Sequence, residues 1–164
     1  MNEKKAVIRA VCISEKKGQQ KHAVERIMLR PQHGIVGDAH AGNWHRQVSL
    51  LGCESVAKLQ EKVSVPLYPG AFAENILCEG IRLYELPVGT KLRIGCALCE
   101  VTQIGKECHA DCAIRRQAGD CVMPREGIFA VVLEAGCAQA GDFVEIVESG
   151  RRSPINRVTV LPVE

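Results

Sequence analysis

The run Lys91-Leu-Arg-Ile-Gly-Cys-Ala-Leu-Cys-Glu-Val-Thr-Gln-Ile104 carries the clearest strand pattern in this chain. Apolar and polar residues alternate over residues 91–94, which is the period of a half-buried strand, and an apolar, β-branched run follows over 97–104. Gly95 stands between the two runs, where a turn residue belongs. This stretch predicts a sheet protein made of short strands that are joined at glycines.

The same signals recur on either side of this stretch, and helical signals are few. Further strands are predicted over residues 6–13, 128–133, 143–147 and 157–161, and a tight β connection over 136–142. Val56, Leu59 and Val63 at helical spacing predict one helix over 54–63, with Glu54 and Lys58 as a favourable i,i+4 pair. The fold class expected is therefore mainly β, a barrel or a sandwich with a few short helices.

Length and composition limit the classes of function. The 164 residues fit one domain, expected over 1–150, with 151–164 as a C-terminal edge strand or tail. Twenty-one basic and 19 acidic side chains are too balanced for a nucleic-acid binder. No apolar run reaches the ~20 residues of a membrane helix, so no membrane partner is expected. The N-terminus is polar and Arg9 interrupts the apolar run over 6–13, so this run predicts a strand and not a signal peptide, and hence a cytoplasmic protein.

Nine cysteines are many for a chain of this length, and their number is odd. Without an export signal, a disulfide framework is not expected, and the thiols are interpreted as reduced. Five of them lie among apolar or small residues, where a free cysteine packs as a small hydrophobic side chain. These five are Cys12, Cys53, Cys78, Cys96 and Cys137.

Three of the other four cysteines are concentrated in one segment. Arginines at 115, 116 and 125 stand near it, and positive charge favours the thiolate, which is both nucleophile and metal ligand. A short helix is expected from about Asp111, which would place one of these cysteines in its first turn, where the helix dipole also favours the thiolate. Four sulfur or imidazole side chains fall within fourteen residues here: Cys108, His109, Cys112 and Cys121.

Two kinds of site are compatible with this segment. One is a site for a cofactor or for sulfur chemistry. The other is a structural zinc site, for which Cys96 and Cys99 have the spacing of a ligand pair. A zinc knuckle places both cysteines in one turn, whereas the strand pattern places Cys96 in a turn and Cys99 within the sheet. Zinc is therefore the less favoured reading.

Polar residues elsewhere are candidates for binding an anionic ligand. Arg46, in a loop read as solvent-facing, can hold phosphate through two parallel hydrogen bonds, and His40 can donate to it. The alternative is a solvated loop in which Asp38 forms an Asx-turn. Asn75 can pair with a ligand as donor and acceptor, or it caps a turn. Arg125 can neutralise phosphate or thiolate, or it pairs with its neighbour Glu126 on the surface.

Taken in order, several pieces of the chain resemble the MOSC family, named for the C-terminal domain of molybdenum cofactor sulfurase. The resemblance covers roughly residues 5–148 and is closest to small stand-alone bacterial members. No single piece is specific, but their common order is. The pieces are Gly34-Ile-Val-Gly-Asp-Ala-His40, Arg46-Gln-Val-Ser-Leu-Leu51, Phe72-Ala-Glu-Asn-Ile76, Leu86-Pro-Val-Gly-Thr-Lys-Leu92, the cysteine-rich run through Met123-Pro-Arg-Glu-Gly-Ile-Phe129, and Gly141-Asp142.

The resemblance implies a MOSC-like β-barrel with a cleft that carries one important cysteine. In molybdenum-bearing relatives that cysteine holds the metal, within a Cys-x-x-Cys-Ile-Leu-like stretch. Here Cys112-Ala-Ile matches its apolar end, so the role of metal ligand and catalytic thiol is carried to Cys112 first and to Cys108 second. The spacing between these two cysteines is one residue longer than in the relatives. The cofactor would be of the molybdopterin type, bound by Asp38, His40, Arg46, Asn75, His109 and Arg125.

The function expected from the resemblance is binding of molybdenum cofactor, or sulfur carriage through a cysteine persulfide during its sulfuration or handling. A sulfur donor or a molybdoenzyme would then be a partner. Two alternatives remain open: a molybdenum-dependent reductase of N-hydroxylated substrates, and a zinc-stabilised adaptor without a small-molecule site. Pyridoxal phosphate binding is implied only as a family-level association.

Overall fold

The structure is a computed structural model, and it describes residues 5–105 and 123–148. Strands dominate, and the helical elements are short. In chain order the elements are β1 (Lys5–Ile13), β2 (His22–Val24), β3 (Ile27–Arg30), β4 (Gly34–Ile35), β5 (Val48–Gly52), α1 (Cys53–Gln60), β6 (Ile76–Glu79), the 3-10 turn η1 (Leu83–Glu85), β7 (Lys91–Ile94), β8 (Ala97–Ile104), α3 (Met123–Glu126), β9 (Ile128–Glu134), β10 (Gly136–Ala138) and β11 (Phe143–Glu148).

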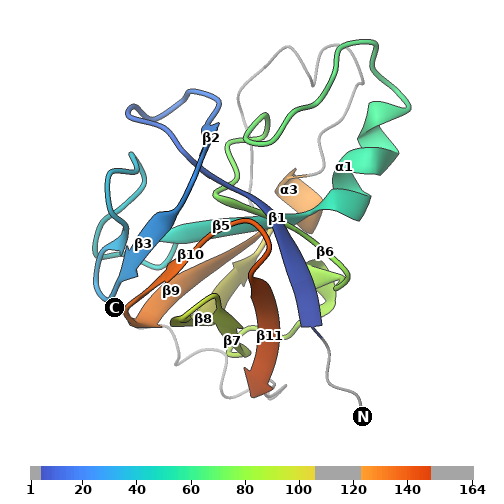
Figure 1. Cartoon of the computed structure of the whole chain (residues 1–164). Helices are drawn as coiled ribbons and strands as arrows, with labels where there is room; N and C mark the ends of the chain where they lie inside the picture. Colours follow the sequence, from blue (N-terminus) through green and yellow to red (C-terminus); the bar gives the residue numbers. More distant parts are fainter. Residues whose placement is uncertain (1–4, 106–122, 149–164) are drawn as a thin grey trace.

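The main sheet closes into a barrel, as expected from the resemblance (Figure 1). Around the ring the strand order is β11-β7-β8-β9-β5-β6-β1, and pairing of β1 with β11 closes it. β5 and β6 run parallel, and the other pairs in the ring run antiparallel. β2 extends the sheet beside β1, and β10, β3 and β4 form a separate small sheet. Figure 1 shows this small sheet on the left and α1 on the upper right.

Two apolar regions lie on opposite faces of the barrel strands, because successive side chains of a strand alternate between its faces. The barrel interior is filled by residues such as Ile8, Leu50 and Ile128, all with at most 1% of their surface exposed. Their neighbours in sequence point to the opposite face of the same strands, because successive strand residues alternate. Strand residues of that opposite face, together with Leu59 of α1 and two residues of the loop before β6, form what we call the outer cluster: Ala10, Cys12, Leu51, Leu59, Ala71, Phe72, Leu77 and Phe129.

Most of the elements expected from the sequence are confirmed. The strands over 91–94 and 97–104 are β7 and β8, and they pair with each other directly. The helix over 54–63 is α1, which begins one residue earlier and ends at Gln60, three residues earlier than the apolar spacing indicated. Leu59 and Val63 are both buried, but Val63 lies in a turn beyond the helix.

Two local expectations are wrong. Residues 136–142 are not only a connection, because Gly136–Ala138 forms β10 and pairs with β3. The pair of Glu54 with Lys58 does not form either. Glu54 accepts a hydrogen bond from the backbone nitrogen of Gly80 at 2.9 Å, and Lys58 instead binds Glu126 at 2.7 Å. Tertiary partners compete successfully with an exposed helix pair that is worth only a few tenths of a kcal/mol.

In the part of the chain that the structure describes, no helix is long and apolar enough to cross a membrane. Residues 151–164, predicted as an edge strand or a tail, lie outside the described residues, and so does the strand predicted over 157–161. Those two predictions therefore stay predictions.

Gly70 offers a direct test of how the loop before β6 is packed. Its φ is +91°, and a Cβ added there would lie 2.1 Å from the carbonyl oxygen of Lys21. We expect Gly70→Ala to lower the free energy of unfolding by roughly 3 kcal/mol or more, since backbone strain and a backbone clash combine. Thermal unfolding should show this as a melting temperature lower by roughly 6–12 °C.

Gly141 is the matched control, because its φ is +96° but an added Cβ would meet no atom within 4 Å. Gly141→Ala should therefore lose only about 1 kcal/mol, the cost of the left-handed backbone alone. Equal melting temperatures for the two variants would show that the contact between Gly70 and Lys21 is not tight.

Candidate functional site

The loop between β4 and β5 contains a buried carboxylate. Asp38 accepts hydrogen bonds from the backbone nitrogens of Ser14 and His40, both at 3.1 Å. The bond from His40 is the Asx-turn expected from the sequence, but the loop is not simply solvated there, because the Asp38 side chain has no exposed surface. Its counter-ion is Lys21, whose ammonium lies 2.8 Å from Oδ1 and is also fully buried.

Lys21 joins residues from three parts of the chain. Besides Asp38, its Nζ contacts Oγ of Ser14 at 3.1 Å and Nδ1 of His40 at 3.0 Å. Its backbone nitrogen donates to the carbonyl of Gly70. No sequence signal marked Lys21, since a single lysine before a short strand has the pattern of any exposed lysine.

Arg46 lies against two aromatic rings. Its guanidinium carbon is 4.8 Å from the ring centroid of Trp44 and 5.4 Å from that of Phe129. The indole nitrogen of Trp44 donates to the carbonyl of His40 at 2.9 Å, so Trp44 connects Arg46 with the loop of Asp38. The reading of Arg46 as a solvent-facing residue is therefore wrong: its side chain is half-buried and stacked.

One atom of Arg46 lacks a partner. The Nε atom is buried and makes no hydrogen bond within the described residues. A second cation, Lys17 Nζ, lies 5.9 Å from the centroid of the Trp44 ring. Since Asp38 is already paired with Lys21, this region around Trp44 carries an excess of positive charge. Such a site favours an anionic ligand.

The Asn75 side chain is buried, and groups of the protein itself fill its hydrogen-bonding positions. Its Oδ1 accepts from the backbone nitrogen and the hydroxyl of Ser49, at 3.0 and 3.2 Å, and its Nδ2 donates to the carbonyl of Cys12 at 3.1 Å. With 1% of its surface exposed, Asn75 links β5, β6 and β1. The structure therefore gives it a supporting position under the loops, and not the turn cap that was the alternative.

The neighbouring Glu74 is buried as well. It accepts hydrogen bonds from the backbone nitrogens of Gly70 and Phe72, at 2.7 and 3.1 Å. Burial raises the pKa of Glu74 in spite of these two donors. The Glu74 side chain thus stabilises the loop before β6, and in this loop the carbonyl of Gly70 accepts a hydrogen bond from the backbone nitrogen of Lys21.

The cysteine-rich segment can be located only by its two ends. Cys108, His109, Cys112 and Cys121 lie outside the described residues, and so does the short helix expected from Asp111. At the ends of the segment, Ile104 of β8 is paired with Ile128 of β9, and the backbone nitrogen of Gly105 donates to the carbonyl of Gly127 at 2.7 Å. The segment therefore leaves the barrel and returns to it at one place.

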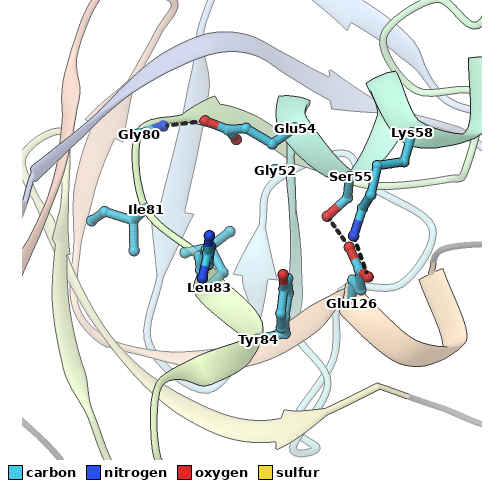
Figure 2. A pocket seen from close by; sticks show the side chains of 10 residues that line it. Gly52, Glu54, Ser55, Lys58, Gly80, Ile81, Leu83, Tyr84 and Glu126 are labelled. Atoms are coloured by element: carbon cyan, nitrogen blue, oxygen red, sulfur yellow. Dashed lines mark hydrogen bonds and ion pairs between the residues drawn. The ribbon is translucent and has the colours of Figure 1, made fainter.

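Arg125 and Glu126 belong to α3, at the returning end of this segment. Arg125 is exposed. Glu126 is held by the hydroxyl of Ser55 and by Lys58 of α1. Burial acts to raise the pKa of Glu126, but the bonds from Lys58 and Ser55 outweigh it, and the pKa is lowered. Figure 2 shows both α1 side chains converging on this carboxylate.

A pocket of about 380 Å³ lies beside this contact (Figure 2). On its other side Glu54 reaches the backbone of Gly80. The walls come from the start of α1, the turn from β6 into η1, and α3. Lys58 and Glu126 neutralise each other at its edge, so the pocket has no excess charge comparable with that around Trp44.

The described cysteines do not form a metal site. Cys99 faces the barrel interior with 0% exposure, whereas Cys96 is exposed in the turn before β8, as the strand pattern predicted. Within residues 5–105 and 123–148, no three His, Cys, Asp or Glu side chains gather closely enough to hold a metal ion. A zinc site that uses the cysteines of the 106–122 segment stays a hypothesis.

Comparison with known proteins agrees with this architecture. The YuaD protein of Bacillus subtilis superposes with a TM-score of 0.74 at 19% identity, covering 92% of this chain and 99% of that one. YiiM of Geobacillus stearothermophilus gives a TM-score of 0.66 at 18% identity, covering 87% and 75%. YiiM of Escherichia coli gives 0.60 at 19%, covering 93% and 72%. At such identities the likeness shows the fold alone.

No curated protein matches the sequence. The family model of the MOSC domain, however, matches residues 37–145, which include the Asp38 loop, Arg46, β5 to β9 and the cysteine-rich segment. The match confirms the resemblance drawn from the sequence motifs, and the chain belongs to the MOSC domain family.

Proposed function

We propose that this domain binds a molybdopterin-type cofactor at the positively charged region around Trp44 and handles its sulfur or metal end through Cys112 or Cys108. MOSC domains are associated in general with molybdenum-cofactor binding and sulfurase-like function. The observation in this chain that supports the proposal most is the buried Nε of Arg46 without a partner.

A buried donor without an acceptor costs about 1–3 kcal/mol, and more if it is charged. Such a group calls for an explanation, and an acceptor supplied by a ligand, an ion or a water is one. The guanidinium lies over the rings of both Trp44 and Phe129, so its position is restricted before a ligand arrives. A phosphate oxygen fits this donor in charge and in geometry, because the guanidinium fork matches phosphate.

The position of the cysteine-rich segment supports the same site. The hydrogen bond between Gly105 and Gly127 shows where the flanks of the segment meet, and Phe129, whose ring contacts the Arg46 guanidinium, lies two residues after Gly127. Two strand residues span about 7 Å. The described flanks of the cysteine-rich segment therefore lie near the arginine, and we infer that Cys108 and Cys112, which belong to that segment, serve the same site. Thiolates are the ligands that suit molybdenum or sulfur at the other end of such a cofactor.

The residues divide into roles on this basis. Arg46 would bind the phosphate, with His40 as a second donor, and His109 and Arg125 remain proposed contacts at the ends of the cysteine-rich segment. Asp38 and Asn75 would support the site and not contact the cofactor, because other groups of the protein already bind both side chains. When bound, the cofactor would supply a sulfur-ligated molybdenum centre for atom exchange. Holding the cofactor and delivering sulfur to it use the same residues.

The function is tested by purifying the protein without oxygen from a host that makes molybdenum cofactor. We expect molybdenum and released pterin to co-purify with it, in amounts that rise and fall together, and both to decrease in a Cys108→Ser/Cys112→Ser variant. Stoichiometric zinc without pterin, together with loss of the fold on chelation, would instead identify the zinc-stabilised adaptor.

Arg46→Lys should weaken cofactor binding roughly tenfold or more, because a charge-assisted hydrogen bond contributes about 1.5–3 kcal/mol and lysine lacks the Nε donor. Loss of ring stacking should also reduce stability by about 1 kcal/mol. Titration of the apoprotein with purified cofactor measures the first effect, and urea unfolding measures the second.

Arg93 is the control for this experiment, since its guanidinium lies on β7 and contacts Glu134 and the carbonyl of Cys96. Arg93→Lys should leave cofactor binding unchanged. The proposed phosphate site is refuted if Arg93→Lys costs as much binding as Arg46→Lys, or if neither Arg46→Lys nor Arg125→Lys has an effect.

Alkylation should distinguish the working thiols from the packed ones. Burial raises the pKa of Cys12, Cys78 and Cys99 to about 12, so at neutral pH roughly one part in 10⁵ of each is thiolate. We expect no labelling of these three in the native protein at mildly acidic pH. Cys112 should label first and Cys108 second, as mapped by mass spectrometry.

Cys96 provides the reference in the same sample, because it is the exposed thiol of the β7–β8 turn. Faster labelling of Cys96 than of both Cys112 and Cys108 would contradict an activated thiol in the cysteine-rich segment.

A further inference from the structure

His45 stands directly before Arg46, and strand β8 holds it by both its backbone and its ring. The carbonyl of His45 accepts a hydrogen bond from the hydroxyl of Thr102. The Nε2 atom of its ring lies 2.7 Å from Oε1 of Gln103. Two consecutive residues of one strand therefore fix His45, although the residue itself is exposed.

The second contact of the Gln103 side chain decides which atom of its amide faces His45. Nε2 of Gln103 donates to the carbonyl of Gly105 at 2.8 Å. A carbonyl oxygen can only accept, so the amide nitrogen must lie on that side and the amide oxygen must face His45. An amide oxygen has no proton to donate. The contact at 2.7 Å is therefore a hydrogen bond in which the Nε2–H of His45 is the donor.

This bond determines what the other ring nitrogen of His45 can do. A neutral imidazole carries one N–H, so a proton on Nε2 leaves a lone pair on Nδ1. In the part of the chain that the structure describes, Nδ1 of His45 makes no hydrogen bond. The ring meets Trp44 edge to face, with 6.0 Å between the two centroids. The exposed imidazole thus offers a hydrogen-bond acceptor to a molecule in solution.

This acceptor lies beside the guanidinium of Arg46. Gln103 of β8 and Phe129 of β9 are direct partners in the sheet, so their side chains are neighbours on one face. The His45 ring binds Gln103, and the Arg46 guanidinium lies over the ring of Phe129. The buried Nε of Arg46 lacks a partner within the described residues. One face of the sheet therefore carries a donor for anionic oxygen and, next to it, an acceptor.

We propose that His45 is a further ligand-binding residue, whose Nδ1 accepts a hydrogen bond from an N–H group of the ligand, and that Gln103 is the positioning residue that keeps the ring proton on Nε2. The ligand is then a phosphate ester that also carries a nitrogen heterocycle with an N–H donor. A fully ionised phosphate alone would use Arg46 and not His45, because its oxygens have no proton to donate. The identity of the ligand rests on the proposed function.

The first test is ¹H–¹⁵N correlation NMR of the ligand-free, histidine-labelled protein at about pH 8, above the titration range of an ordinary imidazole. The chain has five histidines, and the His45 signals are identified by their loss in His45→Leu. We expect an unprotonated Nδ1 and a resolved Nε2–H proton, since a hydrogen bond protects that proton from exchange with water. A protonated Nδ1, or an Nε2–H proton lost to exchange, overturns the proposal.

Two variants of Gln103 separate the acceptor from the contact with Gly105. Gln103→Leu removes both, and the Nε2–H resonance of His45 should disappear through exchange. Gln103→Glu is the matched control, because it keeps an oxygen for His45 and loses the amide donor to the Gly105 carbonyl. The resonance should persist in Gln103→Glu. Its loss in both variants, or its survival in both, would show that the acceptor on Gln103 does not control His45.

The second test follows ligand binding by the fluorescence of Trp44, the single tryptophan of the chain. Methyl phosphate is the probe without an N–H group, and purified molybdopterin cofactor is the complete ligand. Arg46→Lys should weaken binding of both. His45→Leu should weaken binding of the cofactor roughly twofold to tenfold, the contribution of one hydrogen bond, and leave binding of methyl phosphate unchanged.

Equal losses of the two ligands in His45→Leu would refute an N–H contact at Nδ1. If the cofactor binds and His45→Leu has no effect on it, the roles of His45 and Gln103 fail and the proposed function stands. If the cofactor does not bind the wild type at all, the proposed function fails and the ligand role of His45 fails with it.

Discussion

Closure of the barrel through β1 is the constraint on which the rest of the structure depends. The first residues of β1 pair with β11, its middle pairs with β6, and its end pairs with β2. A register shift between Ile8 and Ala10 interrupts the pairing of β1 with β6. A closed ring has no free edge, and β1 then leads directly to Ser14, whose backbone nitrogen binds Asp38. The loop of the candidate site is thereby attached to the strand that closes the fold.

The buried pair of Lys21 and Asp38 matters for arrangement more than for stability. Such pairs often contribute little net free energy, because desolvation of the two charges offsets their attraction. Here the pair is surrounded by hydrogen bonds to Ser14 and His40 that orient both charges. Because the carboxylate is neutralised inside, the positive charges near Trp44 remain available outside. One interaction therefore organises the loop and leaves the region suited to an anion.

The cysteine-rich segment is tied to this region by its flanks. β8 and β9 are neighbours, and the bond from Gly105 to Gly127 brings together the ends of the stretch between them. Glu126 then fastens α3 to α1 through Ser55 and Lys58. Variation within the segment can thus change the chemistry of the thiols while the barrel and Arg46 stay in place.

The sequence alone predicted the strands β1, β7, β8, β9 and β11, the mainly β class and the membership of the MOSC family. Alternation over 91–94 and the ordered motifs suffice for this, because periodicity records which face of each segment is buried. It also marked Arg46, Asp38 and His40 as candidates. Tertiary structure alone decided that Lys21 is buried with Asp38, that Arg46 stacks on Phe129, and that Lys58 binds Glu126 instead of Glu54. Ser55 and Glu126 are 71 residues apart, and contacts at that range exist only once the ring has closed. The local sequence pattern does not predict such long-range contacts, because it indicates which residues are buried and not which residues they contact.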